Sequence, residues 1–273
     1  MSVTESTRSI AVAAGALRAP KVRQRKVLLV AATALLILLI WQIASAFDAS
    51  GLVPTPSGIL LAMPGVFTNP SFWIDTLDTS LAILEGLAIG VVFGTLIGLL
   101  TGRVRWLRGL TAPYVAGLYA VPLLALVPLA TIWLGYSPVA RLALITVAAL
   151  LPCIVSTVDG ARKIARELED AAFVLHMPKR RVLFDLVFPA TLPYIMAGVN
   201  VAIGRAIVAA IAVEFLASVP GLGRFILINA RSFHQDASIV GVFVLVVLGV
   251  LGTTAVEAAR RRMAPWHNPR GEK

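Results

Sequence analysis

Six long stretches of this sequence contain no charged residue, and they restrict the fold more than any other feature. A helix needs about 20 mostly apolar residues to cross a bilayer, where every backbone N–H and C=O must be paired because water is absent. A mean hydropathy of +0.88 with 14% charged residues leaves too few polar groups for the surface of a soluble domain. We therefore expect an all-α membrane protein with six spans. The stretches run from Val27 to Phe47, Gly86 to Gly102, Gly109 to Ala140, Leu142 to Val158, Leu186 to Gly204 and Ala237 to Val256.

The third and fifth helices are not expected to end where their uncharged stretches end. The third exceeds one upright span, but Leu134-Gly135-Tyr136-Ser137-Pro138 is a turn signal that ends it. We predict one helix there, kinked at Pro122 and Pro128. The fifth helix is expected to continue past Arg205 to about Ser218.

The basic residues lie mostly on one side of these spans, which predicts the orientation. Lys and Arg stay on the cytoplasmic side of membrane proteins. If both termini are cytoplasmic, only Arg141, Arg224 and Arg231 lie outside and Arg205 lies within a span. The cations of the cytoplasmic segments therefore account for the net charge of +10, and a nucleic-acid partner is not required to explain it. The expected cytoplasmic cations are Arg8, Arg18, Lys21, Arg23, Arg25, Lys26, Arg103, Arg105, Arg108, Arg162, Lys163, Arg166, Lys179, Arg180, Arg181, Arg260, Arg261, Arg262, Arg270 and Lys273.

The first stretch has a second interpretation as a signal peptide. A basic segment precedes it, and Ala44-Ser45-Ala46 resembles a cleavage site. Its apolar run exceeds the usual core of about 7 to 15 residues in a signal peptide, so a membrane anchor is the favoured interpretation.

Small residues recur every four positions in two spans, which places them on one helix face. Lipid gives no hydrophobic drive for helix association, so such faces promote close packing. We expect tight helix contacts, with lining of a solute path as the alternative. The single cysteine, Cys153, is expected to be a small buried residue. The two stripes are Gly86, Gly90, Gly94, Gly98 and Gly102, and Gly198, Ala202, Ala206 and Ala210.

Three charged residues fall inside or at the edge of spans, where each needs a partner or water. Arg205 and Glu214 are nine residues apart, which places them on opposite faces of a helix, so they cannot pair with each other. Glu214 continues the second small-residue stripe and is expected to face protein, either in a structural hydrogen bond or near a gate. Glu85 lies near an outer helix end and is expected to reach the interface.

The segment from Asp159 to Asp185 is too long and too patterned for a simple connection. An apolar stripe at helical spacing predicts an amphipathic helix that ends at His176-Met177-Pro178, followed by a second short helix from Lys179 to Phe184. A cytoplasmic helix pair of this kind either lies on the membrane surface or docks to a partner. The stripe consists of Ile164, Leu168, Ala171, Ala172 and Leu175.

This segment resembles the EAA loop of bacterial ATP-binding-cassette importer permeases. That loop has Glu-Ala-Ala, three residues, Gly and a later Pro, against Asp170-Ala171-Ala172, three residues, His176, twelve residues and Pro189 here. The resemblance covers about residues 54 to 258. Within the family, the sequence is similar to the branch that imports nitrate, sulfonates and taurine. It includes Pro54-Thr55-Pro56-Ser57, the first glycine stripe, Ala120-Val121-Pro122 to Ile132-Trp133-Leu134-Gly135, and Glu214 followed by Gly221-Leu222-Gly223.

The resemblance implies a type I importer transmembrane domain at residues 27–258, with a coupling loop at 159–189 and basic cytoplasmic tails at 1–26 and 259–273. Two residues depart from the pattern. Asp170 has the same charge as the usual Glu but a shorter side chain, and His176 replaces a Gly that typically adopts a left-handed conformation at a helix end. The coupling residues implied are Glu169, Asp170, Ala171, Ala172, Leu175, His176, Met177, Lys179, Arg180, Arg181 and Pro189, and the candidates for the pathway or gate are Arg205, Glu214, Pro122 and Pro128.

The sequence contains no phosphate-binding Gly-x-x-x-x-Gly-Lys-Ser/Thr loop, no His-x-x-x-His zinc motif and no Gly-x-Ser-x-Gly elbow. We therefore expect a transport subunit without a cofactor or metal of its own, in the bacterial inner membrane. The resemblance implies a second permease copy, two cytoplasmic ATPase subunits that bind ATP and Mg²⁺, and an external solute-binding protein. Arginines outside and within the spans suggest a small anionic solute. A membrane anchor or receptor and an intramembrane enzyme are the alternatives.

Overall fold

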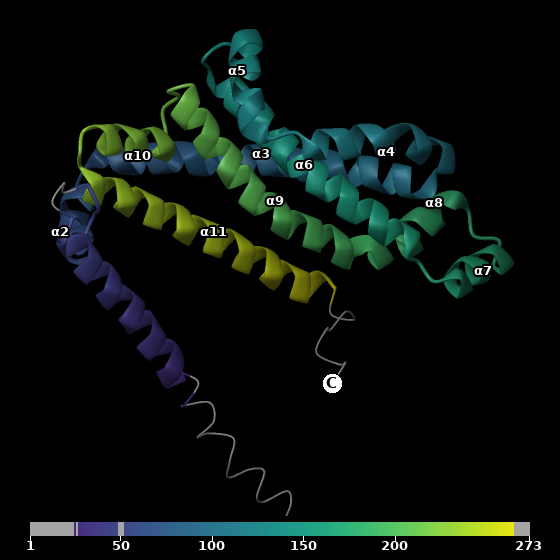
Figure 1. Ribbon diagram of the computed structural model, residues 1–273. Helices are drawn as coiled ribbons and strands as arrows, with labels where there is room; N and C mark the ends of the chain where they lie inside the picture. The colour runs from purple at the N-terminus through teal and green to yellow at the C-terminus, as the bar shows by residue number, and fades with distance from the viewer. Residues whose placement is uncertain (1–24, 26, 49–51, 265–273) are drawn as a thin grey trace, which may run out of the picture. The chain divides into compact units, whose positions relative to one another are not determined.

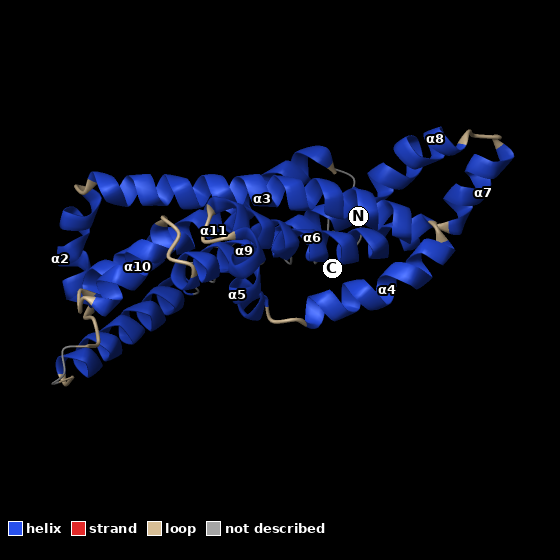
Figure 2. Cartoon of the chain, turned by 90° about the horizontal axis from the view of Figure 1, so that it is seen from above, coloured by secondary structure: helices blue, strands red, loops and turns tan. Residues whose placement is uncertain are grey.

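The computed structural model describes residues 25, 27–48 and 52–264, and every regular element in this part of the chain is a helix (Figures 1 and 2). The chain divides into two units, residues 1–62 and 63–273. In the first unit, an apolar helix spans Val27–Ala46, and its mean hydropathy over 18 residues is 2.6. After it, the Ser57 N–H donates to Gln42 Oε1 at 3.1 Å. Helix α2 (Pro56–Phe67) begins in this unit and ends in the second.

The second unit is a helical bundle built on α3 (Pro70–Arg103), α6 (Pro138–Arg162) and α9 (Phe188–Leu216). Helix α3 begins well before the predicted apolar stretch because Asn69 caps it: the Asn69 Oδ1 accepts from the Ser71 N–H at 3.0 Å, and Pro70 occupies the first turn. The other elements are α4 (Arg105–Ala120), α5 (Leu123–Leu134), α7 (Arg166–Val174), α8 (Lys179–Arg181), the π-helix Val182–Val187, α10 (Leu222–Arg231) and α11 (Gln235–Met263).

The first glycine stripe packs α3 against α6. An added Cβ would lie 2.7 Å from the Ala149 Cβ at Gly90 and 2.7 Å from the Cys153 Cβ at Gly94, closer than two carbon atoms can approach. The facing residues on α6 also repeat every four positions, from Ile145 to Ala161. Because the glycines of α3 have no side chains, the backbones of α3 and α6 lie close together, which confirms the predicted packing.

The second small-residue stripe packs α9 against α6. An added Cβ at Gly198 would lie 2.9 Å from the Ser156 Cβ, and Ala202, Ala206 and Ala210 are fully buried. Cys153 is also fully buried between these helices, as predicted. The centre of the bundle is therefore made mainly of small side chains.

The third predicted helix is not a single kinked helix, so that prediction is wrong. Helices α4 and α5 meet at a bend of 98°. Val121 and Pro122 both have extended backbones, with ψ angles of 127° and 117°, because a proline disfavours the helical region for the preceding residue and cannot donate to the turn before it. Pro128 lies within α5 without breaking it. Gly135, with φ 75°, then forms the predicted turn into α6.

Five described helices are long and apolar enough to cross a membrane, and the bent α4–α5 pair makes a sixth if it counts as one span. Helix α9 runs unbroken through Arg205 to Leu216, and Ser218 follows it with φ 52°, which confirms the predicted extension. In both views α10 lies at one end of the bundle and α7 and α8 at the other. The six-span, all-α fold that the sequence predicts is therefore present.

Candidate solute path and coupling loop

A buried cluster of polar groups surrounds Glu214 near the end of α9. Its Oε1 accepts hydrogen bonds from Thr79 Oγ1 at 2.8 Å and from Arg141 Nη1 at 3.0 Å, and its Oε2 accepts from the Gly223 N–H at 2.7 Å. Arg141 Nη1 also donates to the Pro220 carbonyl at 2.8 Å, and the Leu222 N–H donates to Thr79 Oγ1 at 2.8 Å. These bonds join α3, α6 and α9 to the turn before α10.

The Gly221-Leu222-Gly223 sequence fits around this carboxylate. Gly221 has φ 152°, a conformation that favours glycine. At Gly223 a Cβ would lie 2.8 Å from Glu214 Oε2, so a side chain there would displace the bonded carboxylate. The motif therefore serves the Glu214 site.

The prediction that Glu214 faces protein is confirmed, since its side chain has no exposed surface. Its partner Arg141 was expected outside the membrane, but lies in the first turn of α6 with only 7% of its surface exposed. The sequence held a signal for this pairing: Arg141 alone separates two uncharged runs, and a charge in such a place needs a counter-charge. Glu85 is exposed, but it lies near the middle of α3 and not near a helix end, so that part of the prediction is wrong because α3 begins earlier than expected. It lines a cavity of about 280 Å³ with Asp78 and Arg141.

Arg205 lies in a different environment on α9. Its guanidinium carbon is 4.0 Å from the centroid of the Tyr119 ring on α4. The side chain lines a cavity of about 300 Å³ between α4, α5, α6 and α9, together with Pro122. The predicted separation of Arg205 from Glu214 is confirmed, because each interacts with a different helix.

Tyr119 lines a second cavity, of about 480 Å³. Its polar lining includes Arg108 at the start of α4 and Asp159 near the end of α6. Tyr119 thus lines this cavity while its ring contacts Arg205, which lines the first. Of the four predicted path residues, the structure brings Arg205 and Pro122 to one cavity, whereas Glu214 and Pro128 lie elsewhere.

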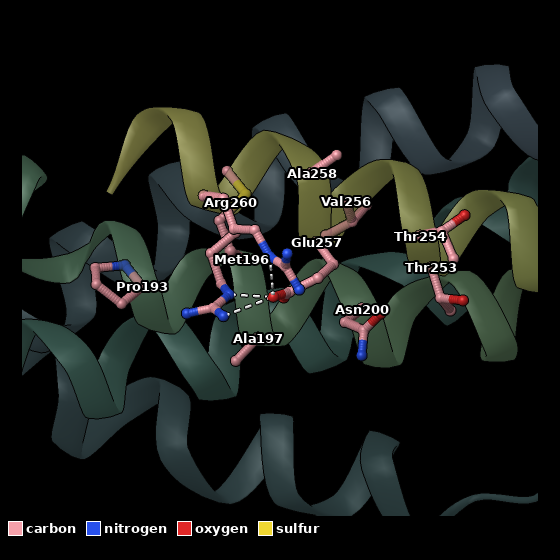
Figure 3. A pocket seen from close by; sticks show the side chains of 11 residues that line it. Pro193, Met196, Ala197, Asn200, Thr253, Thr254, Val256, Glu257, Ala258 and Arg260 are labelled. Carbon is pink, nitrogen blue, oxygen red and sulfur yellow. Dashed lines mark hydrogen bonds and ion pairs between the residues drawn. The ribbon is translucent and has the colours of Figure 1, made fainter. Parts of the chain in front are cut away.

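A further cavity, of about 680 Å³, lies between α9 and α11 (Figure 3). Both of its arginines are paired with its one carboxylate: Glu257 Oε1 is 2.7 Å from Arg260 Nη2 and 3.1 Å from Arg261 Nε. Pro193, Met196 and Asn200 from α9 form the opposite wall. Within the described ranges, no group of three His, Cys, Asp or Glu is placed to hold a metal.

The predicted loop between α6 and α9 forms a helix, a turn and a second short helix. Helix α7 ends in a Schellman motif: the Met177 N–H donates to the Ala172 carbonyl at 3.0 Å and the His176 N–H to the Phe173 carbonyl at 3.0 Å. His176 has φ 52°, so it adopts the left-handed conformation expected of the replaced glycine. Its Nδ1 lies 2.9 Å from the Val174 carbonyl.

The exposed apolar surface of this loop differs from the predicted stripe. Phe173, Val174 and Leu175 are 84%, 72% and 72% exposed, and only Leu175 belongs to the stripe. Ala172 is 5% exposed and is therefore buried within the chain itself. The helical spacing identified α7 correctly but not the residues left uncovered at its end.

The remaining predicted loop residues lie in α7, in α8, in the turn between these helices or at the start of α9. Glu169 lies in α7. Met177 and Pro189 are half-buried, and Pro189 occupies the first turn of α9. The exposed members are Asp170, Ala171, His176, Lys179, Arg180 and Arg181.

Residues 90–265 match the family described as the binding-protein-dependent transport system inner membrane component. The chain belongs to this family. It is 28% identical over 233 residues to the formylaminopyrimidine transport permease protein ThiX of Halalkalibacterium halodurans, covering 85% of this chain and 93% of that protein. It is 27% identical over 235 residues to the putative aliphatic sulfonates transport permease protein SsuC of Bacillus subtilis, covering 85% of each.

The fold also matches a solved transporter. A chain from an inward-facing structure of the MetNI methionine ABC transporter aligns with a TM-score of 0.63 at 15% identity, covering 71% of this chain and 96% of that chain. This likeness confirms the type I permease fold. The predicted family is confirmed as well, so the chain is the permease component of an ABC transporter.

Proposed function

We propose that this permease takes up a small polar solute and that separate ATPase subunits drive it through the α7–α8 loop. The observation that carries the proposal is the exposed apolar group at the end of α7, where Phe173, Val174 and Leu175 lie next to the left-handed turn at His176. Exposed large apolar side chains in a group indicate an interaction surface.

The position of the loop supports its role in coupling. It connects directly to α9 through α8 and the π-helix at residues 182–187, with no flexible segment between them. Val187 is buried against Leu99 and Ala161 of α3 and α6. A force on the loop would therefore reach the bundle through packed contacts.

The other partners follow from the family. We propose a second copy of this chain, two ATPase subunits and an external binding protein that delivers the solute. The named relatives handle solutes as different as formylaminopyrimidine and aliphatic sulfonates, so family membership leaves the solute open. Both termini would lie in the cytoplasm, given the distribution of Lys and Arg.

Substitution of Phe173 by Glu tests the coupling surface without changing the interior of the chain. A charge in an apolar contact is strongly unfavourable, so Phe173→Glu should reduce co-purification of the ATPase at least about tenfold. The matched control is Phe233→Glu, because Phe233 follows α10 in the chain and is 74% exposed. Helix α10 lies at the end of the bundle away from α7 (Figure 1), so this variant should retain the ATPase. Ala172→Glu is a poorer test because Ala172 is buried within the chain.

Two results would contradict the proposal. Normal ATPase binding by Phe173→Glu, combined with a weaker association of the loop with lipid, would show that α7 lies on the membrane surface. Failure of the wild-type chain to bind any ATPase would instead favour a membrane anchor or receptor.

A further inference from the structure

Arg205 carries a charge near the middle of a membrane-spanning helix. It lies 17 residues after the start of α9 and 11 before its end, which at the helical rise corresponds to about 25 Å and 16 Å. Charges at this depth are unfavourable unless they face a partner or water, and they commonly mark paths for ions and polar substrates. The surroundings of Arg205 therefore indicate its role.

The charge has no acidic partner in the described part of the chain. No carboxylate lies within 4.0 Å of its guanidinium, and the one other charged residue of α9, Glu214, is bound by Arg141. The Tyr119 ring offers only the weaker attraction of its π-face. The two arginines thus differ: Arg141 is buried and paired with a carboxylate, whereas Arg205 is half-buried and has no such partner among the described residues.

The space beside Arg205 is a cavity in which it is the only charged residue among the described residues that form the wall. The other lining residues are apolar, including Leu118, Val147 and Leu151. A cavity of about 300 Å³ with one convergent polar group is typical of a small-ligand site. Because this group is a cation, the complementary ligand is an anion.

We propose that Arg205, stacked on Tyr119, forms an anion-binding site in this cavity, and that the solute carries a sulfonate, carboxylate or similar anionic group. This inference rests on the proposed function, since it places the cavity on the solute path. Tyr119 also lines the second cavity, whose wall includes Arg108 and Asp159. An anion passing between them would contact the ring and the guanidinium in turn.

A phospholipid phosphate is a weaker candidate for the same site. Lipid headgroups lie at the edge of a hydrocarbon layer about 30 Å thick, whereas Arg205 is near the middle of its helix. The site therefore fits a solute that has entered the bundle.

Charged thiol reagents can measure the electrostatic field in the cavity without an identified solute. Val208 lines the cavity, is 55% exposed and lies three positions after Arg205 on the same helix, so Val208→Cys places a thiol beside the guanidinium. The full chain in lipid nanodiscs is treated at low salt with sulfonatoethyl or trimethylammonioethyl methanethiosulfonate, two reagents of similar size and opposite charge. The ratio of their rates cancels any change in thiol ionisation.

We expect the anionic reagent to react faster than the cationic one. Arg205→Gln should lower the ratio of anionic to cationic rates at least about fivefold, which is the effect of one charge about 8 Å away in water on two reagents of opposite charge. A less polar cavity would increase this factor. Arg205→Lys should keep most of the preference. The matched control is Arg231→Gln on α10, which should change nothing. The chain without Val208→Cys gives the background rate, since Cys153 is fully buried.

An unchanged ratio in Arg205→Gln would overturn the inference, as would an equal fall in Arg231→Gln. The absence of reaction with either reagent would also overturn it, because it would show that polar molecules do not enter the cavity. This measurement needs neither the ATPase nor transport, so its failure is distinguishable from failure of the proposed coupling.

Discussion

Loss of one partner from the buried Arg141–Glu214 pair should destabilise the protein more than loss of any other polar contact that the structure describes. Glu214→Leu removes the acceptor for Thr79, Arg141 and the Gly223 N–H together. It also leaves the Arg141 guanidinium, whose side chain is 9% exposed, without a counter-charge. The local structure must then either hydrate this cation or unfold around it.

The expected magnitude follows from the burial of both partners. Removal of one member of a buried ion pair costs about 3–5 kcal/mol, whereas replacement of both by apolar residues is often close to neutral. Glu214→Leu and Arg141→Met should each destabilise by about that amount. The double variant should be at least about 2 kcal/mol more stable than the sum of the two effects predicts. Glu214→Gln keeps one acceptor oxygen, but its NH₂ group would face the Gly223 N–H, which is also a donor. We therefore expect a smaller loss of stability, of about 1–3 kcal/mol.

Reversible unfolding in mixed micelles, followed by circular dichroism, measures these differences. Glu257→Gln on α11 is the control, because that carboxylate is bonded to arginines but 41% exposed, and its removal should have little effect. Additive single effects would refute the reasoning by showing that the two charges do not depend on each other. Wild-type stability in Glu214→Leu would show that the carboxylate is incidental.

Three further predictions concern topology, packing and the turn. A reporter active only in the periplasm should be inactive after Lys273 and active at residue 65, since the segment from Asp48 to Ser80 contains no Lys or Arg; the opposite pattern would invert the topology. Gly94→Ala should destabilise the protein by about 1–3 kcal/mol in the same unfolding assay, because the added Cβ would lie 2.7 Å from the Leu150 carbonyl oxygen. Gly117→Ala is the control: an added Cβ there meets no neighbouring atom within 4 Å, so this variant should be neutral or stabilising. His176→Gly should preserve or improve solute-stimulated ATP hydrolysis, while His176→Val should reduce it because β-branched residues resist positive φ; equal activity of both would show that the turn conformation is unimportant.

Much of the fold was predictable because it depends on local patterns. Uncharged stretches identified the spans, and the four-residue repeat of glycines identified the face of α3 that packs on α6. The left-handed conformation of His176 followed from the position of the usual glycine. Asn69-Pro70 also marks a helix start, but the acidic residues Asp75, Asp78 and Glu85 interrupt the hydropathy signal that defined the second span.

The features that were missed depend on contacts distant in sequence. Arg141 and Glu214 are 73 residues apart, and no periodicity connects them. Likewise, proline at position 122 predicts a disturbance of the helix but does not determine its angle. The observed 98° bend depends on the packing of α5, where Val127 and Ala130 lie among Leu144, Ala212 and Val213.

Helix α9 connects the three regions on which the proposals depend. Its first turn follows the loop, Arg205 lies near its middle and Glu214 lies in its last turn. Glu214 is bonded to α3, α6 and the first turn of α10, so this end of α9 is held in place. At the other end the π-helix at residues 182–187 interrupts the regular hydrogen-bond pattern, and such segments are often found at functional sites. A displacement of the loop would therefore move the first half of α9 more than its last turn, and Arg205 lies between the two.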